Sequence, residues 1–395
     1  IGKAAVTLKS ATLSKKYDGN ALVNGDTALE VESGFAEGEG ATYNFTGSQT
    51  VVGSSANAFS YELNSNTNID NYAISKQEGT LTVTNREAKY EITVKANSAT
   101  ATYDGKEHEA VGVETYEFTV EGNSYTVSGL STEDPKQKDA GSYTNNITGT
   151  PVVTDKEGNV VTSEFEVKTE NGSLEIGKAA VTLKSATLSK KYDGNALVNG
   201  DTALEVESGF AEGEGATYNF TGSQTVVGSS ANAFSYELNS NTNIDNYAIS
   251  KQEGTLTVTN REAKYEITVK ANSATATYDG KEHEAVGVET YEFTVEGNSY
   301  TVSGLSTEDP KQKDAGSYTN NITGTPVVTD KEGNVVTSEF EVKTENGSLT
   351  ITPRQVNLTS ESASKPYDGT PLTRPSVTGG DGFVAGEVTD IRATG

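Results

Sequence analysis

Two histidines are the residues of this 395-residue chain best suited to acid–base or metal chemistry. His108 is flanked by Glu107 and Glu109, and the same triplet recurs around His283. An imidazole beside a carboxylate can move a proton or hold a metal ion. Because neither histidine is accompanied by a second histidine, a cysteine or a clear nucleophile, the pattern predicts a solvated loop histidine and no catalytic residue.

An asparagine-rich loop is the second candidate, since oxygen-bearing side chains at alternate positions can bind calcium. Its members are Asn64, Asn66, Asn68 and Asp70, and they recur as Asn239, Asn241, Asn243 and Asp245. A calcium loop needs several carboxylates and a central glycine, whereas this loop has one carboxylate and Ile69 at the glycine position. We therefore interpret the segment as a turn and expect neither a metal nor a cofactor.

Lys15 is a candidate for a covalent cross-link. It shares strand parity with Leu13 and Tyr17, which predicts an inward side chain, and Asn85 has inward parity on a later strand. Some surface proteins join a core lysine to an asparagine. The alternative is a lysine whose stem packs while its ammonium reaches water. We favour this alternative, because the other strand lysines have outward parity.

A Tyr-Asp-Gly triplet occurs five times and is the clearest repeated motif. It stands at Tyr17-Asp18-Gly19, Tyr103-Asp104-Gly105, Tyr192-Asp193-Gly194, Tyr278-Asp279-Gly280 and Tyr367-Asp368-Gly369. Glycine accepts a positive φ, aspartate can cap its own turn, and tyrosine can close the core of a module. We expect a structural corner at each triplet and no cofactor-binding role.

The spacing of the triplets divides the chain into modules. Residues 1–174 are identical to residues 176–349, and successive triplets lie alternately 86 and 89 residues apart. The predicted modules are 1–86 and 176–261, here called type A, and 87–175 and 262–350, here called type B. Residues 351–395 begin a diverged type A module. Modules that make small contacts in such an array are expected to unfold nearly independently.

Alternating apolar and polar residues predict strands in every module, as at Val6 and Leu8 or at Ile92 and Val94. No segment has the pattern of a useful amphipathic helix. The fold class is therefore all-β, a tandem array of Ig-like β-sandwich modules, with a β-grasp-like variant as the alternative. Closing strands lead into opening strands without a Gly/Ser or Pro-rich linker, which predicts an extended, semi-rigid rod.

Composition excludes several functions. A net charge of −26 disfavours nucleic acid and anionic lipid as partners. The absence of cysteine excludes disulfides, thiolate catalysis and Cys-ligated zinc. The segment contains no run of apolar residues long enough for membrane insertion. No enzyme activity is expected.

The chain resembles the bacterial YDG/MBG-type Ig-like repeats of large cell-surface proteins and adhesins. The resemblance rests on residues 16–20 around the first triplet, on Gly34-Phe35-Ala36-Glu37-Gly38-Glu39, and on residues 365–370 and 382–387 of the last module. It covers the whole chain and is weaker in type B. It implies a secreted or wall-attached protein on the outer surface of a bacterium, and it supplies no catalytic residues.

Two functions remain open. The first is a structural stalk or fibre shaft, whose partners are the neighbouring modules of the same chain and, in fibres, further copies. The alternative is a repeated adhesive module that binds a host glycan or protein by avidity. Exposed aromatic residues in one segment would favour adhesion, and Tyr116 and Phe118 are the candidates.

Overall fold

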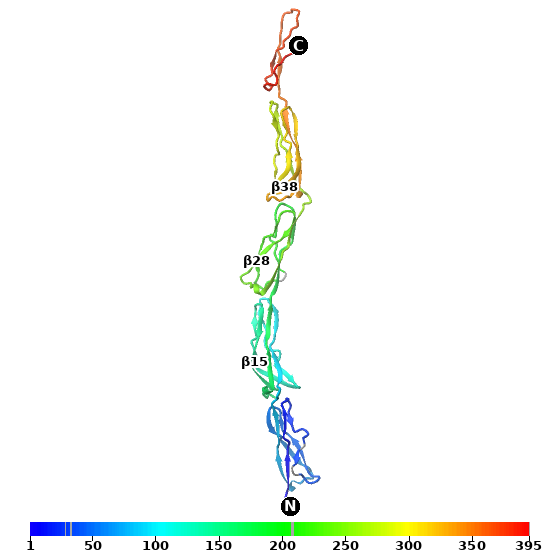
Figure 1. Ribbon diagram of the computed structural model, residues 1–395, viewed down its shortest axis with the longest axis vertical. Helices are drawn as coiled ribbons and strands as arrows, with labels where there is room; N and C mark the ends of the chain where they lie inside the picture. The colour runs from blue at the N-terminus through cyan, green and yellow to red at the C-terminus, as the bar shows by residue number, and fades with distance from the viewer. Residues whose placement is uncertain (28, 32–33, 207–208, 395) are drawn as a thin grey trace. The chain divides into compact units, whose positions relative to one another are not determined.

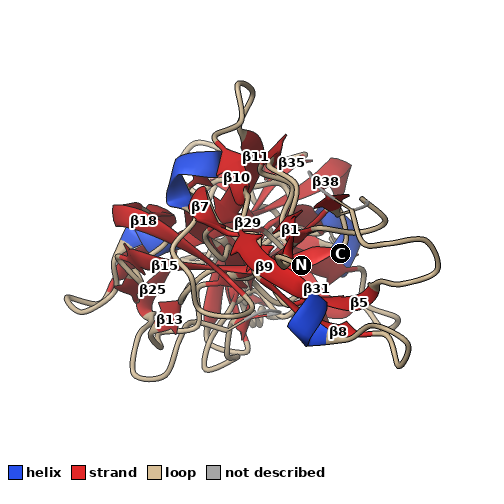
Figure 2. Ribbon diagram, turned by 90° about the horizontal axis from the view of Figure 1, so that it is seen from below, coloured by secondary structure: helices blue, strands red, loops and turns tan. Residues whose placement is uncertain are grey.

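The computed structural model describes residues 1–394 except 28, 32–33 and 207–208. The described residues form strands β1–β42, and their only helices are four 3-10 turns of three residues each (Figure 2). The expected fold class, an all-β tandem array of Ig-like β-sandwich modules, is confirmed. None of the helical turns in this described part has the length or the hydropathy to cross a bilayer.

The first type A module contains ten of the described strands and one helical turn. These are β1 Ala4–Lys9, β2 Leu13–Lys16, β3 Leu22–Val23, β4 Glu30–Val31, β5 Ala41–Phe45, β6 Ser48–Gln49, β7 Gly53–Ala56, β8 Phe59–Leu63, η1 Ile69–Asn71, β9 Tyr72–Gln77 and β10 Thr80–Thr84. They form two three-stranded sheets, β4-β1-β9 and β2-β10-β7, with the small pairs β3-β6 and β5-β8 beside them.

The opening strands of this module pair in parallel with its closing strands. β1 runs beside β9 with Ala4 opposite Tyr72, and β2 runs beside β10 with Leu13 opposite Leu81. Because side chains alternate along a strand, every second residue points inward. The core of the module is Val6, Leu8, Phe59 and Tyr72.

The first type B module follows the same plan. Its elements are β11 Tyr90–Lys95, β12 Ala99–Thr102, β13 His108–Glu109, β14 Glu117–Val120, β15 Asn123–Thr132, β16 Lys136–Gln137, β17 Gly141–Asn145, β18 Ile147–Asp155, η2 Thr162–Glu164, β19 Phe165–Glu170 and β20 Gly172–Gly177. β11 pairs with β19, and β12 with β20, both in parallel. The strands β14, β15 and β18 add an antiparallel sheet.

The second copies repeat these elements. In type A they are β21 Ala179–Lys184, β22 Leu188–Lys191, β23 Leu197–Val198, β24 Glu205–Val206, β25 Ala216–Phe220, β26 Ser223–Gln224, β27 Gly228–Ala231, β28 Phe234–Leu238, η3 Ile244–Asn246, β29 Tyr247–Gln252 and β30 Thr255–Thr259. In type B they are β31 Tyr265–Lys270, β32 Ala274–Thr277, β33 His283–Glu284, β34 Glu292–Val295, β35 Asn298–Thr307, β36 Lys311–Gln312, β37 Gly316–Asn320, β38 Ile322–Asp330, η4 Thr337–Glu339, β39 Phe340–Glu345 and β40 Gly347–Thr352. The last module has β41 Leu358–Ser360 and β42 Val377–Gly379, which pair with each other.

The chain divides into two compact units. The first is Ile1–Val181 with Ser208–Gly215 and Leu238–Ile249, and the second is Thr182–Glu207 with Ala216–Glu237 and Ser250–Gly395. In Figure 1, β15 marks the first unit in cyan and β38 marks the second in orange. The second type A module thus contributes residues to both units.

The junctions between modules are of two kinds. β20 ends at Gly177, past the predicted boundary at 175, and β21 begins at Ala179, so only Lys178 separates them. Ile176 pairs with Ala101 and so belongs to the sheet of the type B module. After type A, residues 85–89 separate β10 from β11. The expectation of a direct junction therefore holds after type B and is wrong after type A.

Candidate functional site

Each Tyr-Asp-Gly triplet forms the same turn. The glycine φ lies between 76° and 79° at Gly19, Gly105, Gly194, Gly280 and Gly369. In each turn the aspartate Oδ1 accepts the backbone N–H of the residue two positions later, at 2.9–3.0 Å. In type B this N–H holds the pKa of the aspartate carboxyl below its usual range. The turn is thus closed by its own side chain.

The histidines lie in short strands and are hydrogen-bonded to these turns, so the expectation of a loop position was wrong, although part of each side chain is open to solvent. His108 lies in β13, and its Nε2 is 2.9 Å from Asp104 Oδ1. His283 and Asp279 repeat the contact at 2.8 Å. The pairing of β13 with β16 places the ring over the turn, where its side chain is 26% exposed. The described residues contain no group of three or more His, Cys, Asp or Glu side chains that could hold a metal.

The type A tyrosine enters the core of the following module. Tyr17 is fully buried in a cluster that includes Ile92, Val94 and Phe165 of type B. Its hydroxyl lies 3.3 Å from the hydroxyl of Tyr125, and burial raises its pKa. The expectation that this tyrosine closes the core of its own module is therefore corrected. Tyr192 repeats the arrangement with Tyr300.

The hairpin β14–β15 receives the type A turn. Asn123 Nδ2 donates to the carbonyl oxygen of Asp18 at 3.3 Å. A Cβ on Gly19 would lie 2.3 Å from Tyr125 Oη and 2.6 Å from Asn123 Nδ2. Only glycine fits, because of both the positive φ and this close approach.

The linker after type A is held by a buried carboxylate. Glu164 is 1% exposed and accepts the backbone N–H of Arg86 and the hydroxyl of Ser163, both at 2.8 Å. The Arg86 guanidinium lies 3.9 Å from the ring centroid of Tyr90 and donates to the carbonyl oxygen of Tyr17 at 3.1 Å. These contacts fix the linker against both neighbouring modules.

The type B tyrosine makes a different, polar contact. The Tyr103 hydroxyl donates to Glu214 Oε1 at 2.6 Å, and the Tyr247 hydroxyl donates to Glu214 Oε2 at 2.7 Å. The rings of the two tyrosines meet edge to face at 5.3 Å. A Cβ on Gly105 would lie 2.9 Å from Ala211 Cβ. One carboxylate of a type A module thus binds its own tyrosine and the tyrosine of the preceding module.

An asparagine completes this contact. Asn246 Oδ1 accepts the backbone N–H of Ala140, and its Nδ2 donates to Asp139 Oδ1, each at 2.8 Å. Asn246 is 2% exposed. Since both the oxygen and the nitrogen of the amide side chain have a hydrogen-bond partner, the contact has a defined geometry.

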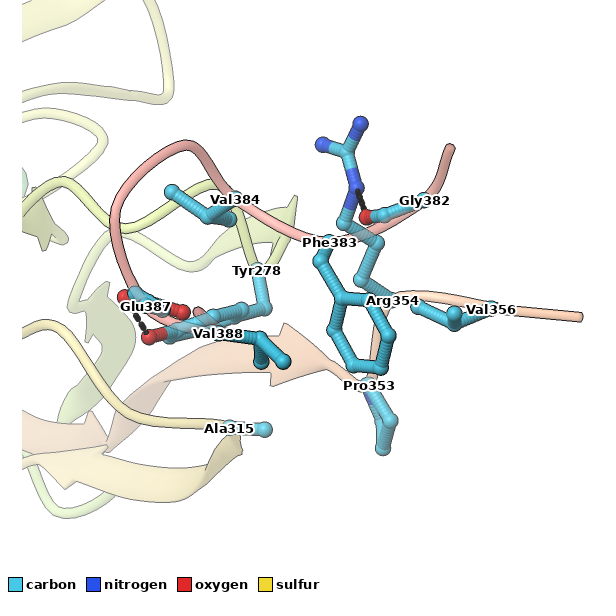
Figure 3. Close-up of a pocket in the computed structure, with 10 residues that line it drawn as sticks. All are labelled: Tyr278, Ala315, Pro353, Arg354, Val356, Gly382, Phe383, Val384, Glu387 and Val388. Carbon is cyan, nitrogen blue, oxygen red and sulfur yellow. Dashed lines mark hydrogen bonds between the residues drawn. The ribbon is translucent and has the colours of Figure 1, made fainter. Parts of the chain in front are cut away.

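Tyr278 meets the last module in the same way (Figure 3). Its hydroxyl donates to Glu387, which raises its pKa to about 12, and Lys313 Nζ lies 3.6 Å from the same carboxylate. The position that corresponds to Tyr247 lies beyond the 45 residues of this module. A pocket of about 470 Å³ is found beside Tyr278, lined in part by Phe383, Val384 and Glu387, which correspond to the residues that contact Tyr247.

The fifth turn shows the motif without a neighbour. Tyr367 is 99% exposed, and a Cβ on Gly369 would meet nothing within 4 Å. The turn geometry nevertheless equals that of the other four. The triplet therefore forms its turn from local interactions, and the docking is a separate property.

The cross-link candidate is an ion pair. Lys15 Nζ donates to Asp18 Oδ1 at 2.6 Å and to the carbonyl oxygen of Asn20 at 2.7 Å, with 23% of its side chain exposed. Asn85 is exposed. The lysine stem thus packs inward, while its ammonium group donates hydrogen bonds to the turn.

The asparagine loop is hydrogen-bonded to the loop that contains Gly38. Asn66 Nδ2 donates to the carbonyl oxygen of Gly38 at 2.6 Å, and Asn68 Oδ1 caps η1 by accepting the N–H of Asp70 at 3.0 Å. These hydrogen bonds fix the segment that carries Glu39. The asparagines therefore support the end face of the type A module.

The two aromatic candidates for adhesion, Tyr116 and Phe118, do not form an exposed cluster. Tyr116 and Phe118 are half-buried and pack against the cluster that contains Tyr125. The Tyr116 hydroxyl also reaches the carbonyl oxygen of Leu130 at 3.4 Å. Both side chains pack against the core, and Phe118 also lines a surface groove over β14 and β15.

Sequence reasoning missed the acceptors of the type B turn, Glu214 and Asn246. A signal was present, since the Gly-Phe-Ala-Glu-Gly-Glu segment of residues 34–39 recurs at 209–214 and, in the form Gly-Phe-Val-Ala-Gly-Glu, at 382–387. Its last residue is the glutamate that meets a tyrosine hydroxyl in every case. The recurrence pointed to a contact surface, but the tyrosine of the preceding module that docks on it lies more than 100 residues away in the sequence.

Comparisons with known proteins give matches among solved structures only, at low sequence identity. No family model matches it, and no curated protein sequence is found to be similar. Among solved structures, SGBP-B of the Bacteroides ovatus mixed-linkage glucan utilization locus has 11% identity and a TM-score of 0.14, covering 92% of this chain and 72% of its own. Drosophila N-cadherin EC1-4 has 11% identity and a TM-score of 0.20, covering 74% and 81%. The N-terminal eight Ig domains of the Down Syndrome Cell Adhesion Molecule have 12% identity and a TM-score of 0.14, covering 96% and 60%.

Proposed function

We propose that this chain is the structural repeat region of an extracellular bacterial surface protein and acts as a semi-rigid stalk or fibre shaft. The resemblance to YDG/MBG-type repeats implies this location, and the proposal includes no enzymatic role. A stalk must transmit tension from one module to the next without unfolding. The organisation of the strands suits that task.

The observation that carries the proposal is the parallel pairing of opening and closing strands. The chain enters a type A module through β1 and leaves through β10, and β1 pairs in parallel with β9 over six residues. β2 pairs in parallel with β10 over four residues. Tension applied at the two ends pulls the paired strands in opposite directions. The inter-strand hydrogen bonds are then loaded together in shear, as they also are between β11 and β19.

The junctions support the same role. After type A, Tyr17 and Val83 belong to the apolar cluster of the type B module. After type B, a single residue separates β20 from β21, and Tyr103 is bound by Glu214. Both arrangements restrict bending between neighbours.

Small-angle scattering on the whole chain tests the stalk. A strand of 8–10 residues spans about 25–35 Å, so we estimate about 40 Å per module with its loops, or about 160 Å for four modules. A rod of that length has a radius of gyration of roughly 50 Å, whereas a compact chain of this size has about 21 Å. A radius near the compact value would overturn the proposal.

Single-molecule pulling tests the shear geometry, and the absence of cysteine allows handles to be placed freely. Handles at residue 1 and at an introduced Asn85→Cys load β1–β9 and β2–β10 in shear. Handles at residue 1 and at Asn71→Cys, just before β9, separate β1 from β9 one hydrogen bond at a time. We expect a clearly higher rupture force for the first pair. Equal forces would show that the parallel strands do not carry the load.

A repeated groove favours adhesion as a second candidate. It lies over β14 and β15, is lined by Glu117, Phe118 and Lys156 among others, and measures about 420 Å³. The second type B module has the same groove, of about 390 Å³. Binding of soluble glycans to the whole chain, lost in a Lys156→Ala, Lys331→Ala double variant, would support this candidate.

A further inference from the structure

The end face of a type A module, made by Phe35, Ala36, Glu39, Asn71 and Tyr72 in the first module, occurs in a free and an occupied form. In the second type A module the corresponding residues contact the Tyr103 turn. Asn246 is 2% exposed there, whereas Asn71, identical in sequence and local geometry, is exposed. Both residues follow an asparagine cap and donate their backbone N–H to it in the same way. The difference in exposure is caused by the docked type B module.

The free face presents its polar groups ready for a partner. Glu39 Oε2 accepts from the Tyr72 hydroxyl, as Glu214 Oε2 accepts from Tyr247. In the occupied face Glu214 Oε1 accepts from Tyr103, while the Glu39 carboxylate accepts from Tyr72 alone among the residues that the structure describes. The acceptor for a second tyrosine is thus already in position.

We propose that this end face is a docking site for the Tyr-Asp-Gly turn of a type B module, including a type B module of a second copy of the chain. The docked tyrosine donates to Glu39 and packs against the ring of Tyr72. The Asn71 amide accepts the backbone N–H of Ala315 and donates to the carboxylate of Asp314, as the Asn246 amide does with Ala140 and Asp139. This inference concerns assembly and holds whether or not the chain acts as a stalk.

The site distinguishes the two kinds of turn. A type A turn docks by burying Tyr17 and presenting the Asp18 carbonyl to Asn123 on β14–β15 of type B. A type B turn docks on a glutamate and an asparagine of type A. Because each turn needs hydrogen-bond partners that only the other type carries, a donor on type B for the type A turn and acceptors on type A for the type B turn, contacts form as A onto B and B onto A. Strict alternation follows.

Residues 1–352 provide a chain with both halves of the contact free. Strands β1–β40 pair only with one another, and β41 pairs only with β42. The clusters around Tyr17 and Tyr192 and the core around Val6 contain no residue after 352. The four complete modules therefore fold without the last 43 residues, counted from 353 to 395. Removing these residues uncovers the Tyr278 turn, which Val384 and Glu387 otherwise cover.

Sedimentation equilibrium of residues 1–352 against residues 1–395 tests the proposal. We expect the weight-average mass of residues 1–352 to rise with concentration toward at least twice the monomer mass by about 1 mM, the effective concentration that a short tether supplies. Residues 1–395 should stay monomeric, because their Tyr278 turn is covered. A constant monomer mass for residues 1–352 up to that concentration would overturn the proposal.

Matched variants of residues 1–352 locate the contact. Glu39→Lys and Asn71→Arg should each abolish association, whereas Glu37→Lys, an equal charge change at an exposed position of the same loop, should leave it intact. Asn71→Arg serves as the second test because its side chain has no role in the fold of the free module. Association that survives both substitutions, or that Glu37→Lys removes equally, would show that another surface is responsible.

Discussion

The hydroxyl of Tyr17 lies 3.3 Å from the hydroxyl of Tyr125, which is 108 residues later in the chain and in the next module. Both rings are buried in one cluster with Val83 of type A and Phe165 of type B. A type A module and the type B module after it therefore share an apolar core. The pair, and not the single module, is expected to be the unit that unfolds cooperatively.

Substitution of Tyr17 tests this unit. Deleting a buried aromatic side chain costs about 3–5 kcal/mol, so Tyr17→Ala should strongly destabilise the first pair. Unfolding enthalpy scales with the number of residues, so calorimetry should show roughly half of the total enthalpy moved to a lower temperature. If the modules were independent, roughly a quarter would move. The identical second pair stays at the original temperature as an internal reference.

The exposed tyrosine of the fifth turn provides the control. Tyr367→Ala removes the same side chain from the same motif, where the ring is 99% exposed. Its effect on either transition should stay within about 0.5 kcal/mol. A large shift would mean that the motif acts through its local turn and not through docking.

A glycine of the docked turn gives a second prediction. In Gly194→Ala the new Cβ would lie 2.2 Å from Tyr300 Oη, at a φ of +77°. Left-handed strain of about 1–2 kcal/mol and displacement of the ring, about 1–3 kcal/mol more, should add together. Gly38→Ala has a φ of +79° and open space around it, so only the strain applies. Urea unfolding of the two variants should therefore differ, and equal losses would argue against a tight contact at Gly194.

Several features of this fold were accessible from the sequence. The alternation at Val6 and Leu8 predicted a buried strand face, and the glycine of each Tyr-Asp-Gly triplet predicted the positive φ that is observed. Both are local properties, set by the pleat of one strand or by the stereochemistry of one turn. They do not depend on the arrangement of the modules.

The residues that the tyrosines contact in neighbouring modules could not be predicted from local sequence patterns. Tyr103 and Glu214 are 111 residues apart. The local pattern of neither segment predicts a contact with the other. Likewise, the type B core that Phe118 packs against also contains Tyr17 of the preceding module, which no local pattern indicates. Docking between modules is a tertiary property, and a repeated segment such as residues 34–39 indicates only that a surface exists.

The mass of the intact protein gives a third prediction. Formation of a Lys15–Asn85 amide bond expels ammonia, about 17 Da for each type A module. Lys15 Nζ instead donates to Asp18 Oδ1 and to the carbonyl oxygen of Asn20, and Asn85 is exposed. We expect the mass calculated from the sequence without loss. A deficit of one or two ammonia units, absent in Lys15→Ala, Lys190→Ala, would contradict this.

Alkaline pH should destabilise the protein through its half-buried tyrosines. Desolvation and a hydrogen bond to Glu121 raise the pKa of Tyr90 to about 12, and Tyr265 has the same value for the same reasons. An unfolded tyrosine ionises near 10. Below pH 10 the phenols are neutral in both states, and the stabilisation is fully present. Between pH 10 and about 12 the unfolded chain loses these protons first, so the free energy of unfolding falls as the pH rises.

Urea midpoints at pH 9 and pH 11 measure this fall. Replacing both tyrosines with phenylalanine should make the fall shallower, because two of the groups that drive it are gone while every lysine stays in place. Tyr367→Phe, at the exposed fifth turn, is the matched control and should leave the pH dependence of the parent chain unchanged. An equally steep loss of stability in the double variant would contradict this prediction. The pH dependence would then have to come from the deprotonation of other groups, such as the lysine–glutamate pairs of the outer strand faces.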